Sequence, residues 1–181
     1  DTHLDFIKSG ADVITTNSFS TRRERLIENN SEKYFKYANE KAGELAVKAK
    51  KISNKNILIA GSLPSQKGTY VVDKRDEDLI EKDFFAQAKL IKPFIDFFYL
   101  DVISSSKEVG LCLKAVGKLD LPVLVGLHIS KNGKLPSNES ITETVERHKN
   151  KNWLGVILAC VSPEIIEDTI DEMTKLNLPF G

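Results

Sequence analysis

Leu154-Gly155-Val156-Ile157-Leu158-Ala159 is followed directly by Cys160-Val161-Ser162-Pro163-Glu164, and this change of pattern indicates how the chain folds. The first part contains only apolar residues and glycine, which is typical of a strand covered on both faces. Ser162 can cap a following helix, and Pro163 suits the first helical position, where no amide proton is needed. The stretch therefore predicts a buried strand, a turn at Cys160 and a helix.

The same order of strand and helix recurs along the whole chain. We expect strands near residues 11–15, 56–60, 94–100, 122–127 and 154–159, with another beginning at 178. Helices are expected at residues 2–9, 31–52, 78–92, 104–118, 141–148 and 163–176, with a short one near 22–27. Such alternation is typical of a parallel sheet. It predicts an α/β fold, and a partial (β/α)8 TIM barrel of about strands 2 to 7 fits it. A doubly wound open sheet is the alternative, although no Gly-x-Gly-x-x-Gly follows a strand.

The overall composition is that of an ordinary globular domain, with 41% hydrophobic residues among 181. Its 26 basic and 26 acidic side chains cancel, which argues against nucleic acid or an anionic membrane as the main partner. No apolar run reaches the roughly 18–20 residues of a membrane helix. Two cysteines form no disulfide framework, so we expect a reduced, cytoplasmic setting. No feature indicates an oligomeric state.

Both ends of the chain interrupt a predicted element. The chain begins at Asp1 inside a helical pattern, and it stops at Leu178-Pro179-Phe180-Gly181, which is typical of the start of a strand. We therefore expect residues 1–181 to be a single barrel domain that is truncated at both ends.

The carboxyl ends of the strands of such a barrel form one rim, and this rim carries the active site in TIM-barrel enzymes. Here the rim would collect Thr16, Asn17, Ser62, Asp101, His128 and Cys160. Asp101 follows an apolar run, and a carboxylate there must be paired, hydrated or functional.

Structural explanations for these residues remain open. Cys160 could act as a small buried hydrophobe, Asp101 could cap the next helix together with Ser104, and His128 and Asn17 could be exposed strand ends. The sequence contains no His-x-x-x-His or Cys-x-x-Cys pair, so it holds no complete metal site by itself.

Several phrases, in a consistent order and spacing, resemble the homocysteine S-methyltransferase family, which includes betaine- and S-methylmethionine-dependent enzymes. The phrases are His3–Phe6, Ser9–Phe19, Ala60–Pro64, Asp96–Asp101, Gly133–Leu135 with Ser137, Glu139 and Ser140, Ala159–Glu164, and Leu178–Gly181.

The resemblance implies zinc-dependent transfer of a methyl group from a sulfonium or ammonium donor to homocysteine, giving methionine. Cys160 stands where the family has the first of three zinc cysteines, and the other two would lie beyond residue 181. Asp101 stands in place of a family Glu and would bind the substrate's ammonium group. Asn17, Ser62 and His128 are weaker substrate-binding candidates. Three aromatic side chains could hold the cationic donor by cation–π contact: Phe19, Tyr70 and Tyr99.

The chain also departs from the family pattern. Val102 replaces a Thr, Ala159 replaces an Asn before the zinc cysteine, and Val161 replaces a second Cys. A non-catalytic, zinc-free paralogue that binds a small amino acid or a partner is therefore the alternative. An unrelated barrel enzyme such as a lyase or aldolase ranks last, because no lysine at a strand end supports a Schiff base. We expect the 181-residue chain alone to be inactive.

Overall fold

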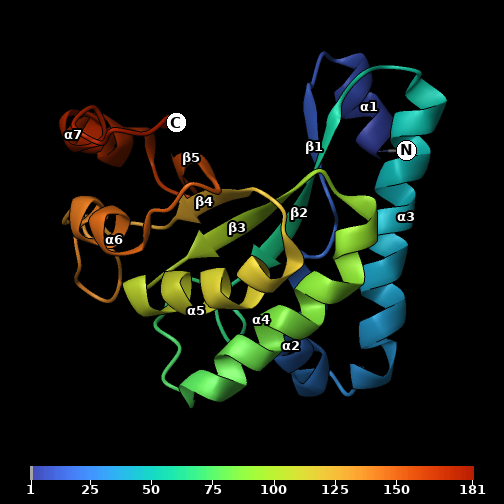
Figure 1. The fold of residues 1–181 in the computed structure, drawn as a ribbon, viewed down its shortest axis with the longest axis horizontal. Helices are drawn as coiled ribbons and strands as arrows, with labels where there is room; N and C mark the ends of the chain where they lie inside the picture. Colours follow the sequence, from blue (N-terminus) through green and yellow to red (C-terminus); the bar gives the residue numbers. More distant parts are fainter. Residues whose placement is uncertain (1) are drawn as a thin grey trace.

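The sheet consists of five parallel strands that pair in the order of the sequence (Figure 1). The computed structural model describes residues 2–181. Its strands are β1 (Val13–Thr15), β2 (Leu58–Pro64), β3 (Phe97–Ile103), β4 (Val123–Leu127) and β5 (Trp153–Leu158). A doubly wound sheet reverses its strand order at one point, whereas a barrel wall does not. The structure is therefore consistent with part of a TIM barrel, as the sequence predicts.

The segment after residue 178 continues the sheet beside β5. Phe180 forms an isolated parallel bridge with Val156, and the Val156 amide donates to the Pro179 carbonyl at 3.0 Å. Gly155 permits this approach, since a Cβ at that position would lie 2.5 Å from the Pro179 oxygen. The predicted sixth strand is thus present as a single bridge, while the five before it form longer ladders.

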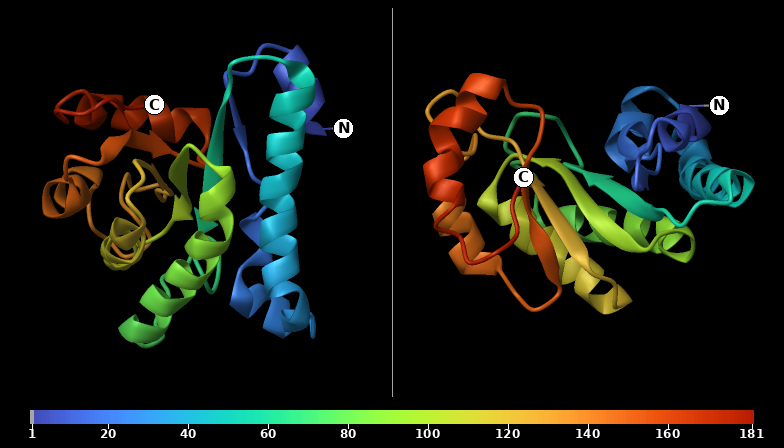
Figure 2. Two further views of the ribbon diagram at one scale, coloured as in Figure 1. Left: turned by 45° about the vertical axis from the view of Figure 1, so that its right-hand side comes forward. Right: turned by 90° about the horizontal axis from the view of Figure 1, so that it is seen from above.

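The helices lie along the outer side of the curved sheet, each beside the next in sequence except for the short second helix (Figure 2). They are α1 (Thr2–Lys8), α2 (Arg23–Glu28), α3 (Phe35–Ser53), α4 (Glu77–Ile91), α5 (Ser106–Val116), α6 (Ile141–His148) and α7 (Pro163–Met173). Ser31 begins a 3₁₀ turn, Glu32–Tyr34, rather than the long helix α3. Ser162 is the N-cap of α7 and Pro163 its first residue, although the serine side chain accepts no bond from a helix amide.

The main core lies between the sheet and helices α4 and α5. Successive side chains of a strand point to opposite faces, and β3 shows the consequence. Phe98 and Leu100 are fully buried in the core, whereas Tyr99 and Asp101 are only partly buried and face the inner side. Burying each such large apolar side chain contributes about 1.5–3 kcal/mol. The outer face therefore supplies stability, and the inner face is left for polar residues.

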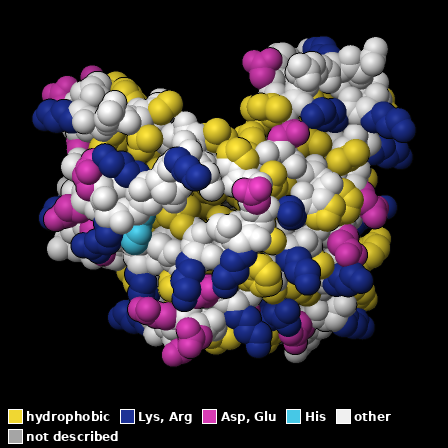
Figure 3. Space-filling view, in the orientation of Figure 1, with side chains coloured by type: hydrophobic (Ala, Val, Ile, Leu, Met, Phe, Trp, Pro, Cys, Tyr) yellow, Lys and Arg dark blue, Asp and Glu magenta, His cyan; other side chains and the backbone are white. Residues whose placement is uncertain are grey.

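The surface is hollowed between α1 and α7, with hydrophobic side chains on the walls (Figure 3). On the side of β1, a hollow of about 820 Å³ is lined by residues of α1, β1, the loop after β1 and α3, including Phe6, Val13, Asn17 and Leu45. β1 is one edge of the sheet, so this hollow borders unpaired backbone. Within residues 2–181, no helix has the length and apolar character that a membrane crossing requires.

Candidate active site

Asp101 lies within β3 on the inner side of the sheet. Its Oδ2 accepts a hydrogen bond from the Ser62 hydroxyl at 2.7 Å, and the Tyr99 hydroxyl donates to the same carboxylate. Ser62 pairs with Tyr99 in the register of β2 and β3, which places both side chains beside Asp101. Burial raises the pKa of Asp101, while the two hydroxyl groups act in the opposite direction. The carboxylate is therefore held in one orientation.

One sequence expectation for this strand is wrong, and so is one alternative explanation of Asp101. β3 does not end at Asp101 but continues to Ile103, and Asp101 does not cap the next helix. The N-cap of α5 is Ser105, whose hydroxyl accepts from the Glu108 amide at 3.2 Å.

The backbone is irregular directly after Asp101. Val102 has a φ of 63°, and the pairing of β3 with β4 shifts register between Leu100 and Ile103. A positive φ is a genuine outlier for a β-branched residue, and such outliers cluster at functional sites. The irregularity allows β3 to pass Asp101 while keeping its carboxylate on the inner side.

Cys160 comes two residues after β5 and carries an exposed thiol on a left-handed backbone with φ 55°. The Tyr70 hydroxyl donates a hydrogen bond to its sulfur, and this bond is the largest cause of the raised pKa of Tyr70. The Tyr70 ring also lies against the His128 ring, with centroids 4.5 Å apart. His128 Nδ1 lies 3.4 Å from the Ala159 carbonyl oxygen. The structure thus brings Tyr70, His128 and Cys160 together.

Electrostatics place the Asp101 and Cys160 groups in one region. Burial raises the pKa of Tyr99 most, and the charges of Asp101 and Cys160 raise it further. The same two charges also raise the pKa of Tyr70. The Tyr99 ring packs against Gly126, where a Cβ would lie 2.6 Å from a ring carbon. Ser62, Asp101, His128 and Cys160, all proposed from sequence, therefore share a site that the two tyrosines connect.

Of the candidates from the loop after β1, Asn17 lies outside this group and Thr16 lies beneath Ser62. Asn17 is exposed and lines the hollow beside β1. Thr16 is buried, and its hydroxyl oxygen accepts from the Ser62 amide at 3.1 Å, which fixes the backbone under the site. Phe19 already lies against the Arg22 guanidinium, at 5.3 Å from its ring centroid. Of the three aromatic candidates, Tyr70 and Tyr99 are the ones beside Cys160.

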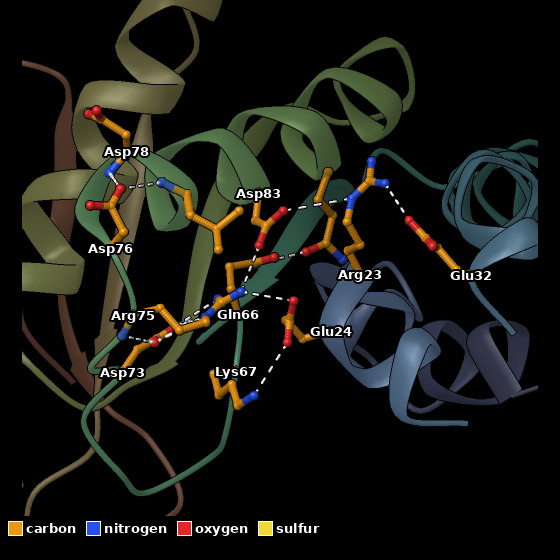
Figure 4. A network of polar contacts seen from close by, with 12 residues as sticks. Arg23, Glu24, Glu32, Gln66, Lys67, Asp73, Arg75, Asp76, Asp78 and Asp83 are labelled. Carbon is orange, nitrogen blue, oxygen red and sulfur yellow. Dashed lines mark hydrogen bonds and ion pairs between the residues drawn. The ribbon is translucent and has the colours of Figure 1, made fainter. Parts of the chain in front are cut away.

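The loop that carries Tyr70 runs from β2 to α4 and is fixed at both ends (Figure 4). Near its start, the buried Gln66 donates to the Pro64 carbonyl and to Gln87 Oε1, at 2.9 and 3.1 Å. Near its end, Arg75 bonds a carboxylate of its own loop, one of α4 and one of α2. These partners are Asp73 at 2.7 Å, Asp83 at 2.9 Å and Glu24 at 3.1 Å.

Sequence reasoning missed the anchors of this loop. The closely spaced opposite charges of Asp73-Lys74-Arg75-Asp76 were the available signal.

A complete metal site is absent from residues 2–181, where no three His, Cys, Asp or Glu side chains are grouped to hold an ion. Of the two thiols, Cys160 is the one that suits a zinc ligand, because it is exposed at the rim. Cys112 is fully buried, and burial raises the pKa of its thiol well above the ordinary value. The described residues therefore fit one zinc thiolate.

Comparison with solved structures identifies barrel enzymes. The homocysteine methyltransferase MmuM from Escherichia coli, in its metallated form, matches with a TM-score of 0.80 and 14% identity, over 98% of this chain and 69% of its own. Its apo form matches with a TM-score of 0.72 and 14% identity, over 98% of this chain and 67% of its own. A 2,3-dimethylmalate lyase of the PEP mutase/isocitrate lyase superfamily matches with a TM-score of 0.53 and 10% identity, over 99% of this chain and 61% of its own. At these identities the similarities establish the fold.

The comparison by sequence is more specific. No curated protein sequence matches the chain significantly. The family model described as homocysteine S-methyltransferase matches residues 1–181, the whole chain. The rim residues are thus part of a homocysteine S-methyltransferase-like enzyme fold, and the chain belongs to the homocysteine S-methyltransferase family.

Proposed function

We propose that the protein transfers a methyl group from a sulfonium or ammonium donor to the sulfur of homocysteine, giving methionine, with zinc as cofactor. The observation that carries this proposal is the position of the Asp101 carboxylate and the Cys160 thiol around the Tyr99 and Tyr70 hydroxyls. A carboxylate suits the ammonium group of an amino acid, and a thiolate suits zinc. In this proposal the carboxylate holds the ammonium end of homocysteine, and the zinc held by the thiolate binds the sulfur end.

Asp101 binds the ammonium group of homocysteine in this proposal. The carboxylate is partly buried and already accepts bonds from Ser62 and Tyr99, so little reorganisation is needed when the substrate arrives. A bound ammonium group would favour the ionised carboxylate and counteract the rise that burial causes in the pKa of Asp101.

Cys160 provides one zinc thiolate, and two further thiolates come from sequence beyond residue 181. Bound zinc would lower the pKa of the homocysteine thiol, which is roughly 8.5 for a free thiol. Tyr70 donates a hydrogen bond to the Cys160 sulfur, and a thiolate ligand can accept such a bond while it holds a metal. His128 supports the Tyr70 ring in this position.

The cationic methyl donor lies against the faces of Tyr70 and Tyr99, because an aromatic face attracts a desolvated cation. The remainder of the proposal concerns the whole protein. It is a single barrel domain that acts on small molecules in a reducing, cytoplasmic setting. Both cysteines of the chain are free thiols, in agreement with such a setting.

The zinc content of the purified full-length protein tests the proposal. About one zinc per chain, lost in Cys160→Ala and kept in Cys112→Ala, supports it. The second variant is the matched control, since it removes a thiol from the core. Absence of zinc under reducing conditions would contradict the enzyme and favour the zinc-free paralogue. For the zinc-loaded enzyme, Asp101→Asn should raise KM for homocysteine about tenfold or more, with a smaller effect on the donor's KM.

A further inference from the structure

A second hollow, of about 500 Å³, lies away from Cys160, between the segment after β1 and the start of the loop from β2 to α4. Its polar lining consists of Arg22, Arg25, Lys67, Ser20, Thr69 and Glu28. Three of these side chains are cationic and one is a carboxylate. Its volume lies within the range of about 300–1,000 Å³ that is usual for small-molecule sites.

Arg22 is the unusual member of this lining. Its side chain is only 6% exposed, and its Nε has no hydrogen-bond partner. Its one hydrogen bond goes from a terminal nitrogen to the Phe19 carbonyl at 3.1 Å. Within residues 2–181, no carboxylate lies within 4 Å of this guanidinium, whereas Arg23 and Arg75 each have such a partner.

The charges around Arg22 are unbalanced. An arginine stays protonated in proteins, so its burial without a carboxylate has a cost in free energy. Burial and the charge of Arg25 both lower the pKa of Arg22, and Glu28 raises it by a smaller amount. An anion in the hollow would reduce the repulsion between the two arginines and give the buried guanidinium its missing partner.

We propose that this hollow binds an oxyanion group of a small molecule, a phosphate or a carboxylate, with Arg22 as the buried anchor. A guanidinium presents its donors in a planar fork that matches either group. Arg25 and Lys67 stand at the mouth with side chains 56% and 48% exposed. Their present partners are Glu28 at 3.8 Å and Glu24 at 3.4 Å, and exposed pairs of this kind are weak enough to be exchanged. The Ser20 and Thr69 hydroxyls provide further donors.

The hollow is a separate site that nevertheless touches the same loop. Thr69 lines the hollow, and the next residue, Tyr70, contacts Cys160 and His128. A bound anion would therefore restrain the segment that carries Tyr70. Binding itself requires neither zinc nor methyl transfer, so the site can be tested whatever the activity of the protein.

Isothermal titration of the full-length protein with inorganic phosphate, and separately with succinate, tests the site. Sodium chloride keeps the ionic strength constant, because exposed charges are screened by salt. We expect saturable binding of at least one of the two anions. Arg22→Gln should weaken it about tenfold or more, since it removes a charged hydrogen-bond donor. Arg147→Gln, which removes the same charge from an exposed position on α6, should leave the affinity unchanged.

A second variant keeps the test decisive if Arg22→Gln does not fold, as judged by circular dichroism. The double variant Arg25→Gln/Lys67→Gln changes only exposed side chains at the mouth, and it should also weaken binding about tenfold or more. Binding of phosphate alone or of succinate alone identifies the chemical source of the oxyanion. Failure of both anions to bind, or binding that neither variant weakens, overturns the proposal.

Discussion

Glu108 is an acidic side chain in an unusual environment, the interior of the protein. It is fully buried in the first turn of α5, where its Oε2 accepts from the Ser105 hydroxyl at 2.8 Å and its Oε1 has no partner. Burial raises the pKa of Glu108 most, the hydrogen bond from Ser105 acts in the opposite direction, and the charge of Asp73 raises the pKa by a smaller amount. The protonated acid is therefore the better-accommodated form in the folded protein.

We expect Glu108→Gln to stabilise the protein at neutral pH by about 1–3 kcal/mol, because the neutral amide avoids the desolvation cost of a buried carboxylate. The folded-state pKa lies above the unfolded one, so the folded state binds more protons between the two values. The contribution of Glu108 to stability is therefore fully present below its pKa in the unfolded chain, roughly 4.3. This contribution is lost as the pH rises through its pKa in the folded protein. Urea unfolding from pH 4 to 8 should show a flatter pH dependence in the variant.

Glu81→Gln is the control with the opposite sign. Hydrogen bonds from Lys114 and Lys118 lower the pKa of Glu81, so its contribution is present at neutral pH and is lost on acidification. This substitution should not stabilise the protein at neutral pH. Identical pH dependence in Glu108→Gln and the parent would show that Glu108 is not destabilising.

Gly126 tests the packing of the Tyr99 ring. A Cβ at this position would lie 2.6 Å from the Leu100 carbonyl oxygen and from a ring carbon of Tyr99. We expect Gly126→Ala to cost about 1–3 kcal/mol in urea unfolding, as overpacking does, and to displace the hydroxyl beside Asp101. Gly117→Ala is the matched control, since its φ is −57° and no atom lies within 4 Å of the added carbon. If Gly126→Ala leaves the free energy of unfolding unchanged, the Tyr99 ring does not pack against Gly126 as described.

At the scale of elements, the loop from β2 to α4 depends on Arg75. Asp73 and Asp83 are 1% and 3% exposed, and Arg75 is the cation that both of them contact closely. We expect Arg75→Gln to destabilise the protein by about 3–5 kcal/mol, because it leaves the buried Asp73 without a cation and leaves Asp83 with only Arg23, at 3.7 Å. Amide exchange in residues 67–72 should become faster. The measurements are urea unfolding and hydrogen exchange.

Lys50→Gln serves as the comparison for Arg75. Lys50 pairs with Asp96 at 3.3 Å, but both side chains are about one third exposed or more, so the loss should be within about 1 kcal/mol. Equal effects of the two substitutions would contradict the anchoring role of Arg75.

The elements were predictable from sequence to different degrees. The apolar runs at 122–127 and 154–159 located β4 and β5 closely, because a strand buried on both faces leaves a continuous signal. The extension of β3 past Asp101 was not predictable, since it depends on the left-handed Val102 and on the pairing with β4. The same holds for Tyr70, because its contact with Cys160 joins a loop to a distant strand end. Sequence reasoning found the rim residues but not the tyrosines' hydrogen bonds.

At the scale of the whole molecule, the described sheet has an exposed edge at β1. Val13 is 42% exposed there, and the neighbouring Phe6 is 62% exposed in the hollow beside it. Unpaired edge strands tend to pair with other chains. We expect the 181-residue chain to self-associate with increasing concentration, and Val13→Lys to reduce this in sedimentation velocity.

Val47→Lys is the control for a general effect of added charge. Val47 is 39% exposed on α3, away from the strand edge. If Val13→Lys and Val47→Lys reduce self-association equally, the contact between chains does not lie at the β1 edge.

The left-handed backbone at the rim has a consequence for protein engineering. Tyr70, Val102 and Cys160 all have positive φ, and each such non-glycine residue costs about 1–3 kcal/mol. Glycine substitutions that relieve this strain would remove a Tyr70 or Cys160 side chain, or loosen the backbone next to Asp101. Thermostability gained at these positions would therefore be exchanged for loss of the site, and consensus-guided stabilisation of this protein should begin on the outer helices.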